Sequence, residues 1–164
     1  MPTQITTARD TADAIAVAMD ARDHDALMAL YADDVVFHSP VTPNDFRGKE
    51  AVSDLMAHVL NGFETWQRTF VLADGELCVF GVRARIGGRE VELAEEVYVD
   101  ADGRVREQRV HGRPLAGVAA IAAVAGPRMA RRRGPLRAAL VRALAGSLPG
   151  ALARGDALVT RLAR

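Results

Sequence analysis

The sequence has a single cysteine, few aromatic residues and no long uncharged apolar stretch. Cys78 stands alone among 164 residues, which excludes an internal disulfide and suits a reducing compartment such as the cytoplasm. A membrane-spanning helix needs about 18 or more consecutive apolar residues, and we find no uncharged run of that length, so we expect no such helix. The first ten residues lack a basic patch followed by an apolar block, so we expect no signal peptide.

The residue patterns of two kinds of site are also missing. No two of the four histidines stand at metal-ligand spacing, and Cys78 has no neighbouring cysteine, so we expect no metal site. The arginine run 131–133 has no interleaved aromatic residues and belongs to no recognisable nucleic-acid-binding module. We therefore expect no nucleic-acid partner.

The hydrophobic content is ample for a core, and the charge is divided unevenly along the chain. Hydrophobic residues make up 49% of the chain, which suits one domain with an appendage. Residues 128–164 hold nine arginines and one aspartate, a balance of +8, and the preceding residues carry −8. An acidic body with a basic tail suggests that the tail docks on the body, on a partner or on an anionic surface.

Hydrophobic periodicity predicts helices first and hairpin-connected strands after them, which is typical of an α+β domain. We expect helices at 7–22, 26–31 and 49–60, and strands at 35–37, 64–73, 76–86, 89–100 and 104–112. Turn signals separate the last four strands, which predicts an antiparallel meander. An apolar helix follows at 115–125 and is expected to break at Gly126-Pro127. We therefore divide the chain into a domain at 1–115 and a helical extension at 116–164.

One stretch carries a family resemblance. Leu30-Tyr31-Ala32-Asp33-Asp34-Val35-Val36-Phe37-His38-Ser39-Pro40, followed by Phe46-Arg47-Gly48-Lys49-Glu50-Ala51-Val52, indicates a helix end, a short strand, a proline-bearing loop and a new helix. This order resembles the SnoaL-like branch of the nuclear transport factor 2-like superfamily, over about residues 7 to 115. The resemblance implies a cone-shaped, bent antiparallel sheet wrapped by three N-terminal helices around a deep pocket. It also implies a homodimer formed through the outer face of the sheet.

The predicted strand 89–100 gives the sharpest functional signal. Its alternate positions Val91, Leu93, Val97 and Val99 are apolar, and Glu95 shares their face. A carboxyl group on an apolar face must be paired, protonated or placed in a cavity, and burial raises its pKa toward a value useful for acid/base catalysis. The structural alternative is an ion pair with Arg83 or Arg85 of the neighbouring strand. The resemblance places Glu95 in the pocket.

Ketosteroid isomerase, a member of the same superfamily, has three catalytic residues to compare with this sequence. Only one of them has a counterpart here that could play the same role. Its base, an aspartate before a proline, corresponds to Ser39 here, and its helix-borne tyrosine falls near Ile15. Its oxyanion-hole aspartate corresponds to Glu95. A steroid isomerase mechanism is therefore not favoured. Limonene epoxide hydrolase is not matched cleanly either, although Arg83, Arg85, Glu95 and Gln108 could imitate its chemistry.

Other pocket candidates follow from their positions on the predicted strands. His38 is a candidate acid/base because histidine titrates near neutral pH, although strict alternation along the strand points it away from Ser39. We predict Glu95 and His38 as catalytic residues. The predicted substrate-binding residues are Ser39, Gln108, Trp66, Phe37, Val97 and Val110.

These signals favour a cofactor-independent enzyme that acts on a small, largely apolar molecule by acid/base chemistry, as an isomerase, cyclase or epoxide hydrolase. The alternative is a non-catalytic ligand-binding or scaffold protein of the same fold. We expect a cytoplasmic homodimer that requires no cofactor.

The C-terminal extension carries two stripes of large apolar residues. We expect these stripes to pack on the acidic body, chiefly by hydrophobic contact, near the pocket mouth and as a lid over it. Contact of the basic tail with a membrane is the less favoured alternative. The stripes comprise Leu136, Leu140 and Leu144, and then Leu148, Leu152, Val159 and Leu162.

Overall fold

The computed structural model describes residues 7–163 and begins with three helices, at α1 (Ala8–Ala21), α2 (His24–Ala29) and α3 (Lys49–Leu60). The side chain of Thr7 accepts a hydrogen bond from the Asp10 amide, and that of Asp23 accepts one from the Ala26 amide. Each bond satisfies a donor that the first turn of a helix leaves unpaired. The prediction about a signal peptide falls largely on residues 1–6, which lie outside the described residues.

Six strands form one open sheet: β1 (Tyr31–His38), β2 (Phe46–Arg47), β3 (Phe63–Asp74), β4 (Leu77–Ile86), β5 (Arg89–Val99) and β6 (Val105–Arg113). Their order is β2-β1-β6-β5-β4-β3. The predicted meander of β3 to β6 is confirmed, and all pairs are antiparallel except β1 with β6. β1 begins at Tyr31, earlier than predicted, because Asp33 and Asp34 lie exposed within the strand.

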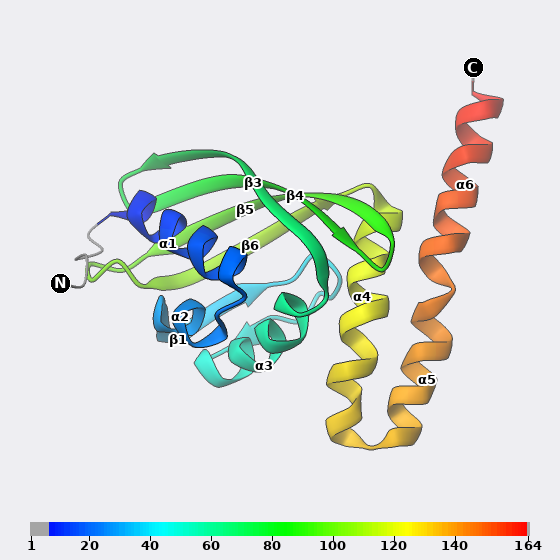
Figure 1. Ribbon diagram of the computed structural model, residues 1–164, viewed down its shortest axis with the longest axis horizontal. Helices are drawn as coiled ribbons and strands as arrows, with labels where there is room; N and C mark the ends of the chain where they lie inside the picture. Colours follow the sequence, from blue (N-terminus) through cyan, green and yellow to red (C-terminus); the bar gives the residue numbers. More distant parts are fainter. Residues whose placement is uncertain (1–6, 164) are drawn as a thin grey trace.

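The sheet curves around the N-terminal helices and buries one face against them (Figure 1). Irregular pairing in β1, β3 and β6 supports this curvature, because an extra residue in one strand bends it. In β6 the irregularity falls between the pairs Val99–Val105 and Tyr98–Glu107. It lets Val105 and Gln108 both face inward although they are three residues apart. The cone fold predicted from the sequence is therefore confirmed.

The C-terminal part is helical, with α4 (Leu115–Ala130), the 3₁₀ turn η1 (Arg131–Arg133), α5 (Pro135–Gly146) and α6 (Leu148–Leu162). The predicted break at Gly126-Pro127 is wrong, since α4 continues through Pro127. A proline inside a helix costs about 3 kcal/mol. The packing of α4 offsets that cost, because Val118, Ala120 and Ile121 belong to the core of the body.

Pro149 and Gly155 were also predicted to break the helix, and neither of them does. Pro149 lies in the first turn of α6, where its missing amide hydrogen is not needed, and Gly155 lies inside the same helix. Only Ser147 separates α5 from α6, and the two helices run in line beside α4, farthest from the sheet (Figure 1).

The leucine stripes of the tail are exposed except for the half-buried Leu152, contrary to the prediction that they pack on the body. Leu136 is 85% exposed, Leu140 60% and Leu144 65%. The buried positions of α5 and α6 are instead the small Ala138 and the ring of Pro149. Small residues let two helices approach closely, so the alanine-rich side faces α4 and the leucines face outward.

Candidate functional site

The concave face of the sheet encloses a cavity of about 310 Å³. Helices α1 and α3 and strands β1, β3, β5 and β6 form most of its wall. The C-terminal helices complete the wall with Ala122, Ala125 and Met129 from α4 and Val141 and Ala145 from α5. The prediction that the extension leaves the sheet beside the pocket therefore agrees with the structure. The wall is mostly apolar, which suits an apolar ligand.

Glu95 is the polar centre of this cavity. Its side chain lies on the inner face of β5 and is 7% exposed, between the fully buried positions of the same face. The alternative of an ion pair with the neighbouring strand does not occur. Arg83 pairs with Glu92, and Arg85 pairs with Glu64 and Glu90.

A chain of three polar side chains crosses the floor of the cavity. The Tyr31 hydroxyl donates to Oε1 of Gln108, and Nε2 of Gln108 donates to Oε2 of Glu95 at 2.5 Å. Gln108 reaches Glu95 because it lies diagonally across the pairing of β5 with β6, opposite Val97. Within residues 7–163, the other carboxyl oxygen of Glu95 has no hydrogen-bond partner and is not a buried unsatisfied atom. It is therefore free to meet a ligand.

Burial controls the ionisation of Glu95 and Tyr31. Removal from water raises the pKa of Glu95 to about 7, and the hydrogen bond from Gln108 partly opposes that rise. Burial also raises the pKa of Tyr31, and the nearby charge of Glu95 adds to the effect. Glu95 thus exchanges a proton near neutral pH while Tyr31 remains a neutral hydrogen-bond donor.

The structure brings most of the predicted substrate-binding residues to the cavity. Ser39, Phe37, Trp66 and Val110 line it together with Glu95 and Gln108. Val97 shares the inner face of β5 but is fully buried in the core and does not line the cavity. The sequence pattern predicts which face of the sheet a side chain lies on. It does not predict whether an inward-facing side chain lines the cavity or is buried in the core.

His38 lies away from the cavity. Its neighbour Phe37 points inward, so alternation along β1 turns His38 outward, where Nδ1 lies 2.7 Å from Asp45 and Nε2 lies 3.0 Å from Glu107. Hydrogen bonds from Arg109 and then His38 hold the pKa of Glu107 below its usual value. The place of His38 gives no support to the predicted catalytic role.

Two contributions to the site did not appear among the sequence-based candidates. Tyr31 was assigned to a helix end, but it is the first residue of β1 and is buried, although the exposed Asp33 breaks the alternation between Tyr31 and Phe37. The extension was expected near the pocket mouth, but which residues of α4 and α5 form the wall depends on tertiary packing, and no local sequence pattern indicates them. Among residues 7–163, no group of three or more histidine, cysteine, aspartate or glutamate side chains could hold a metal ion.

Comparison with known proteins gives a family match. A model of the SnoaL-like domain matches residues 12–110. A search of curated proteins finds no significant match.

Solved structures share the fold. A steroid delta-isomerase from Pseudomonas aeruginosa is 32% identical, with a TM-score of 0.67, and the match covers 77% of this chain and 90% of that one. A protein from Kribbella flavida is 24% identical, with a TM-score of 0.62, over 79% of this chain and 99% of that one. A protein assigned as a SnoaL-like polyketide cyclase, from Shewanella denitrificans, is 16% identical, with a TM-score of 0.56, over 65% of this chain and 90% of that one. The last two show likeness of fold alone.

Proposed function

Because this chain belongs to the SnoaL-like family, we propose that it binds a small, largely apolar organic molecule and transforms it by proton transfer, with Glu95 as acid and base. The observation that carries the proposal is a buried carboxyl group with one free oxygen in an apolar cavity. A catalytic carboxyl works best when its pKa is near the working pH, and burial raises the pKa of Glu95 to about 7.

The proposed step is a proton transfer at carbon. Ionised Glu95 removes a proton from a carbon next to a carbonyl group, and the electron pair of the broken C–H bond passes into an enolate. The protonated carboxyl then returns the proton at a second carbon or at oxygen. Gln108 holds Oε2 of Glu95, so the free oxygen keeps one direction throughout. Ser39, at the cavity wall, orients the substrate.

The likeness to a steroid delta-isomerase makes ketosteroids the first substrate class to test. Two of the catalytic residues that the resemblance leads us to expect are, however, replaced in this chain. Ser39 stands where the resemblance expects the basic aspartate, and Ile15 stands near the expected tyrosine. Both line the cavity. Glu95 would then have to act as the base from the other side of the cavity, so we place this chain nearer a general proton-transfer enzyme than a steroid isomerase.

A second candidate is a non-catalytic ligand-binding protein. One observation favours it: Glu95 is the single charged side chain among the described residues that line the cavity. An enzyme of this kind usually has at least two polar groups that converge on one reacting atom. The chain of Tyr31 and Gln108 converges on Glu95 itself rather than on a ligand atom.

The test combines ligand identification with turnover. Native mass spectrometry of the purified protein identifies a co-purified ligand, and a β,γ-unsaturated ketosteroid serves as the first substrate probe. Where the wild type converts this probe or the ligand identified, we expect Glu95→Gln to convert neither. Glu96→Gln is the matched control, since Glu96 lies on the outer face of β5 and pairs with His111. If Glu95→Gln retains full turnover, the proposed role is wrong. Binding without turnover of the ligand found supports the binding protein instead.

A further inference from the structure

Helices α5 and α6 present a row of exposed large apolar side chains, which is interrupted between Leu148 and Leu158. Together they span Pro135–Leu162, 28 residues, which is about 40 Å of helix. Apolar side chains of this number and exposure on one helical stretch usually mark an interaction surface. The row, which we call the leucine row, comprises Leu136, Leu140, Leu144, Leu148, Leu158, Val159 and Leu162.

The opposite side of the same stretch is already occupied. Ala138 and Pro149 are buried, and Val141 and Ala145 help to line the cavity. Both helices pack on α4, as Figure 1 also shows. The leucine row therefore stays exposed after the other side of the tail has packed on the body. We look for a binding partner that would cover it.

The charge around the leucine row indicates the nature of that partner. Residues 128–164 hold nine arginines against Asp156. Within residues 7–163 one ion pair joins a tail arginine to a carboxylate, Arg132 to Asp54. Arg137, Arg142 and Arg154 are exposed on the same two helices. The tail therefore carries unneutralised positive charge next to apolar surface.

An anionic lipid surface can bind both the apolar side chains and the arginines. Its acyl region accepts leucines, and its phosphates accept arginines at about 1 kcal/mol for each basic residue near the surface. Two copies of the leucine row packed together would instead bring two sets of arginines into contact. Like charges at such an interface are unfavourable.

The stretch Pro135–Leu162 is long and apolar enough to cross a membrane, contrary to the expectation from the sequence. Arg142 and Arg154 lie within it, and a central arginine costs about 2.5–3.5 kcal/mol on insertion scales. One side of the stretch also packs on α4. These features favour a helix that lies in the plane of the membrane surface rather than across it.

We propose that the leucine row of α5 and α6 docks the protein on the surface of an anionic lipid bilayer, with the flanking arginines at the phosphates. Helix α5 also forms part of the cavity wall through Val141 and Ala145, so docking brings this part of the wall next to the lipid. The proposal does not depend on the chemistry at Glu95.

The test is flotation of the full chain with vesicles of phosphatidylcholine alone or of equal parts phosphatidylcholine and phosphatidylglycerol. We expect binding to the anionic vesicles only. Leu140→Glu with Leu144→Glu should reduce the partition coefficient by about tenfold or more. Val17→Glu with Leu72→Glu is the matched control, because it adds the same charge at exposed apolar positions on α1 and β3.

Charge is tested separately with Arg137→Gln and Arg154→Gln, which should weaken binding, against Arg47→Gln and Arg113→Gln on the body, which should not. Circular dichroism melting checks that each variant is folded. Equal binding by the wild type and the double leucine variant would overturn the proposal, as would absence of binding to both vesicles. Self-association that the leucine variant abolishes, without vesicle binding, would also overturn it and assign the row to a second copy.

Discussion

Glu95 makes the stability of the fold depend on pH. Folding raises its pKa from an ordinary 4.5 to about 7, so the native state holds this proton more tightly than the unfolded chain. The free energy of unfolding therefore falls as pH rises through this window, by about 3 kcal/mol in total. Glu95→Gln cannot ionise, so it should be more stable than the wild type at pH 8 and nearly equal below about pH 4.5. Urea denaturation at both pH values measures the difference, with Glu96→Gln as control. A difference independent of pH would contradict the assigned cause.

Gln108 holds the ionised form of Glu95 through a hydrogen bond to Oε2. Gln108→Met keeps the volume but removes the donor, so the pKa of Glu95 should rise further, by about one unit. Carbon NMR of labelled glutamate follows the titration directly. Tyr31→Phe is the control, because it leaves the bond between Gln108 and Glu95 in place. An unchanged pKa in Gln108→Met would mean that the bond contributes nothing in solution.

Helix α4 meets the sheet through a glycine. A Cβ atom built on Gly117 would lie 2.4 Å from the carbonyl oxygen of Glu90 and 3.0 Å from the side chain of Val91. Gly117→Ala should therefore destabilise the fold by about 1–3 kcal/mol, despite the better helix propensity of alanine. Gly155→Ala in α6 meets nothing within 4 Å and should stabilise by up to about 1 kcal/mol. Thermal melting of the pair checks the packing of α4, and stabilisation by both substitutions would show that α4 does not approach β5 so closely.

Local patterns predicted the elements of the body well and those of the tail less well. Alternation predicted the inner face of β5, and the predicted start of α1 lies one residue from the observed start, whereas α2 begins two residues before the predicted position. The prediction for the tail was wrong where tertiary packing overrides a local sequence rule. Pro127 ends an isolated helix, but here the core supports α4 through it. The cavity residues Ser39, Gln108 and Glu95 were predictable from strand parity and family resemblance together, whereas Tyr31 and the α5 wall were not.

Removal of α5 and α6 tests how far the tail belongs to the folded unit. Deletion of residues 134–164 leaves α4 whole but takes Val141 and Ala145 from the cavity wall. We expect a lower melting temperature, more binding of a hydrophobic dye and weaker ligand binding. Moderate salt should have little effect on the intact protein, because one ion pair, Arg132 to Asp54, joins the described tail arginines to the body. Equal stability of the truncated protein, or release of the tail by salt alone, would contradict this account.

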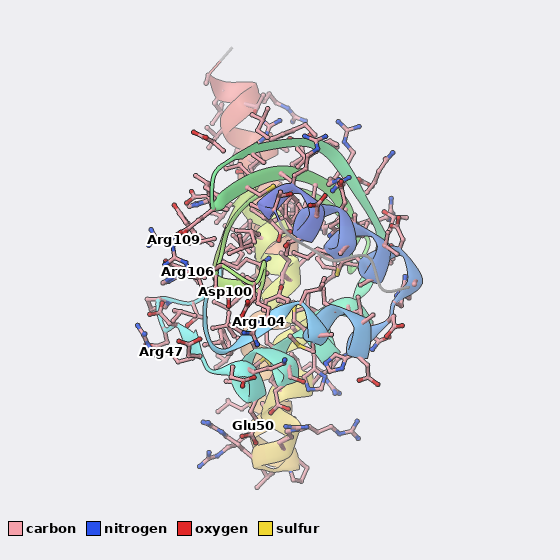
Figure 2. All side chains as sticks on the ribbon, turned by 90° about the vertical axis from the view of Figure 1, so that its left-hand side faces the viewer. Arg47, Glu50, Asp100, Arg104, Arg106 and Arg109 are labelled. Carbon is pink, nitrogen blue, oxygen red and sulfur yellow. The ribbon has the colours of Figure 1, made fainter. Side chains whose placement is uncertain are left out.

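The outer face of the sheet remains our predicted dimer interface. It carries alternating charges that pair within the chain, such as Glu92 with Arg113 and Glu96 with His111. Figure 2 shows Arg106 and Arg109 on the side of the sheet away from α1. Opposite charges can also pair across a two-fold axis. Light scattering at micromolar concentration should give a dimer, and Glu92→Arg with Glu96→Arg should give a monomer. A wild-type monomer would rule out this interface.

The division of the cavity between two stretches of chain has a consequence for protein engineering. Glu95, the proposed acid/base group, and its hydrogen-bond partners come from residues inside the matched domain, whereas Ala122, Ala125, Met129, Val141 and Ala145 come from beyond it. One side of the cavity wall is therefore encoded in a segment separate from Glu95, although most of the wall comes from the matched domain. A mutant library restricted to the inward-facing positions of α4 and α5 would change which molecules fit, while Glu95, Gln108 and Tyr31 stay untouched. Exchange of the whole helical segment with that of a relative would do the same in a single recombination.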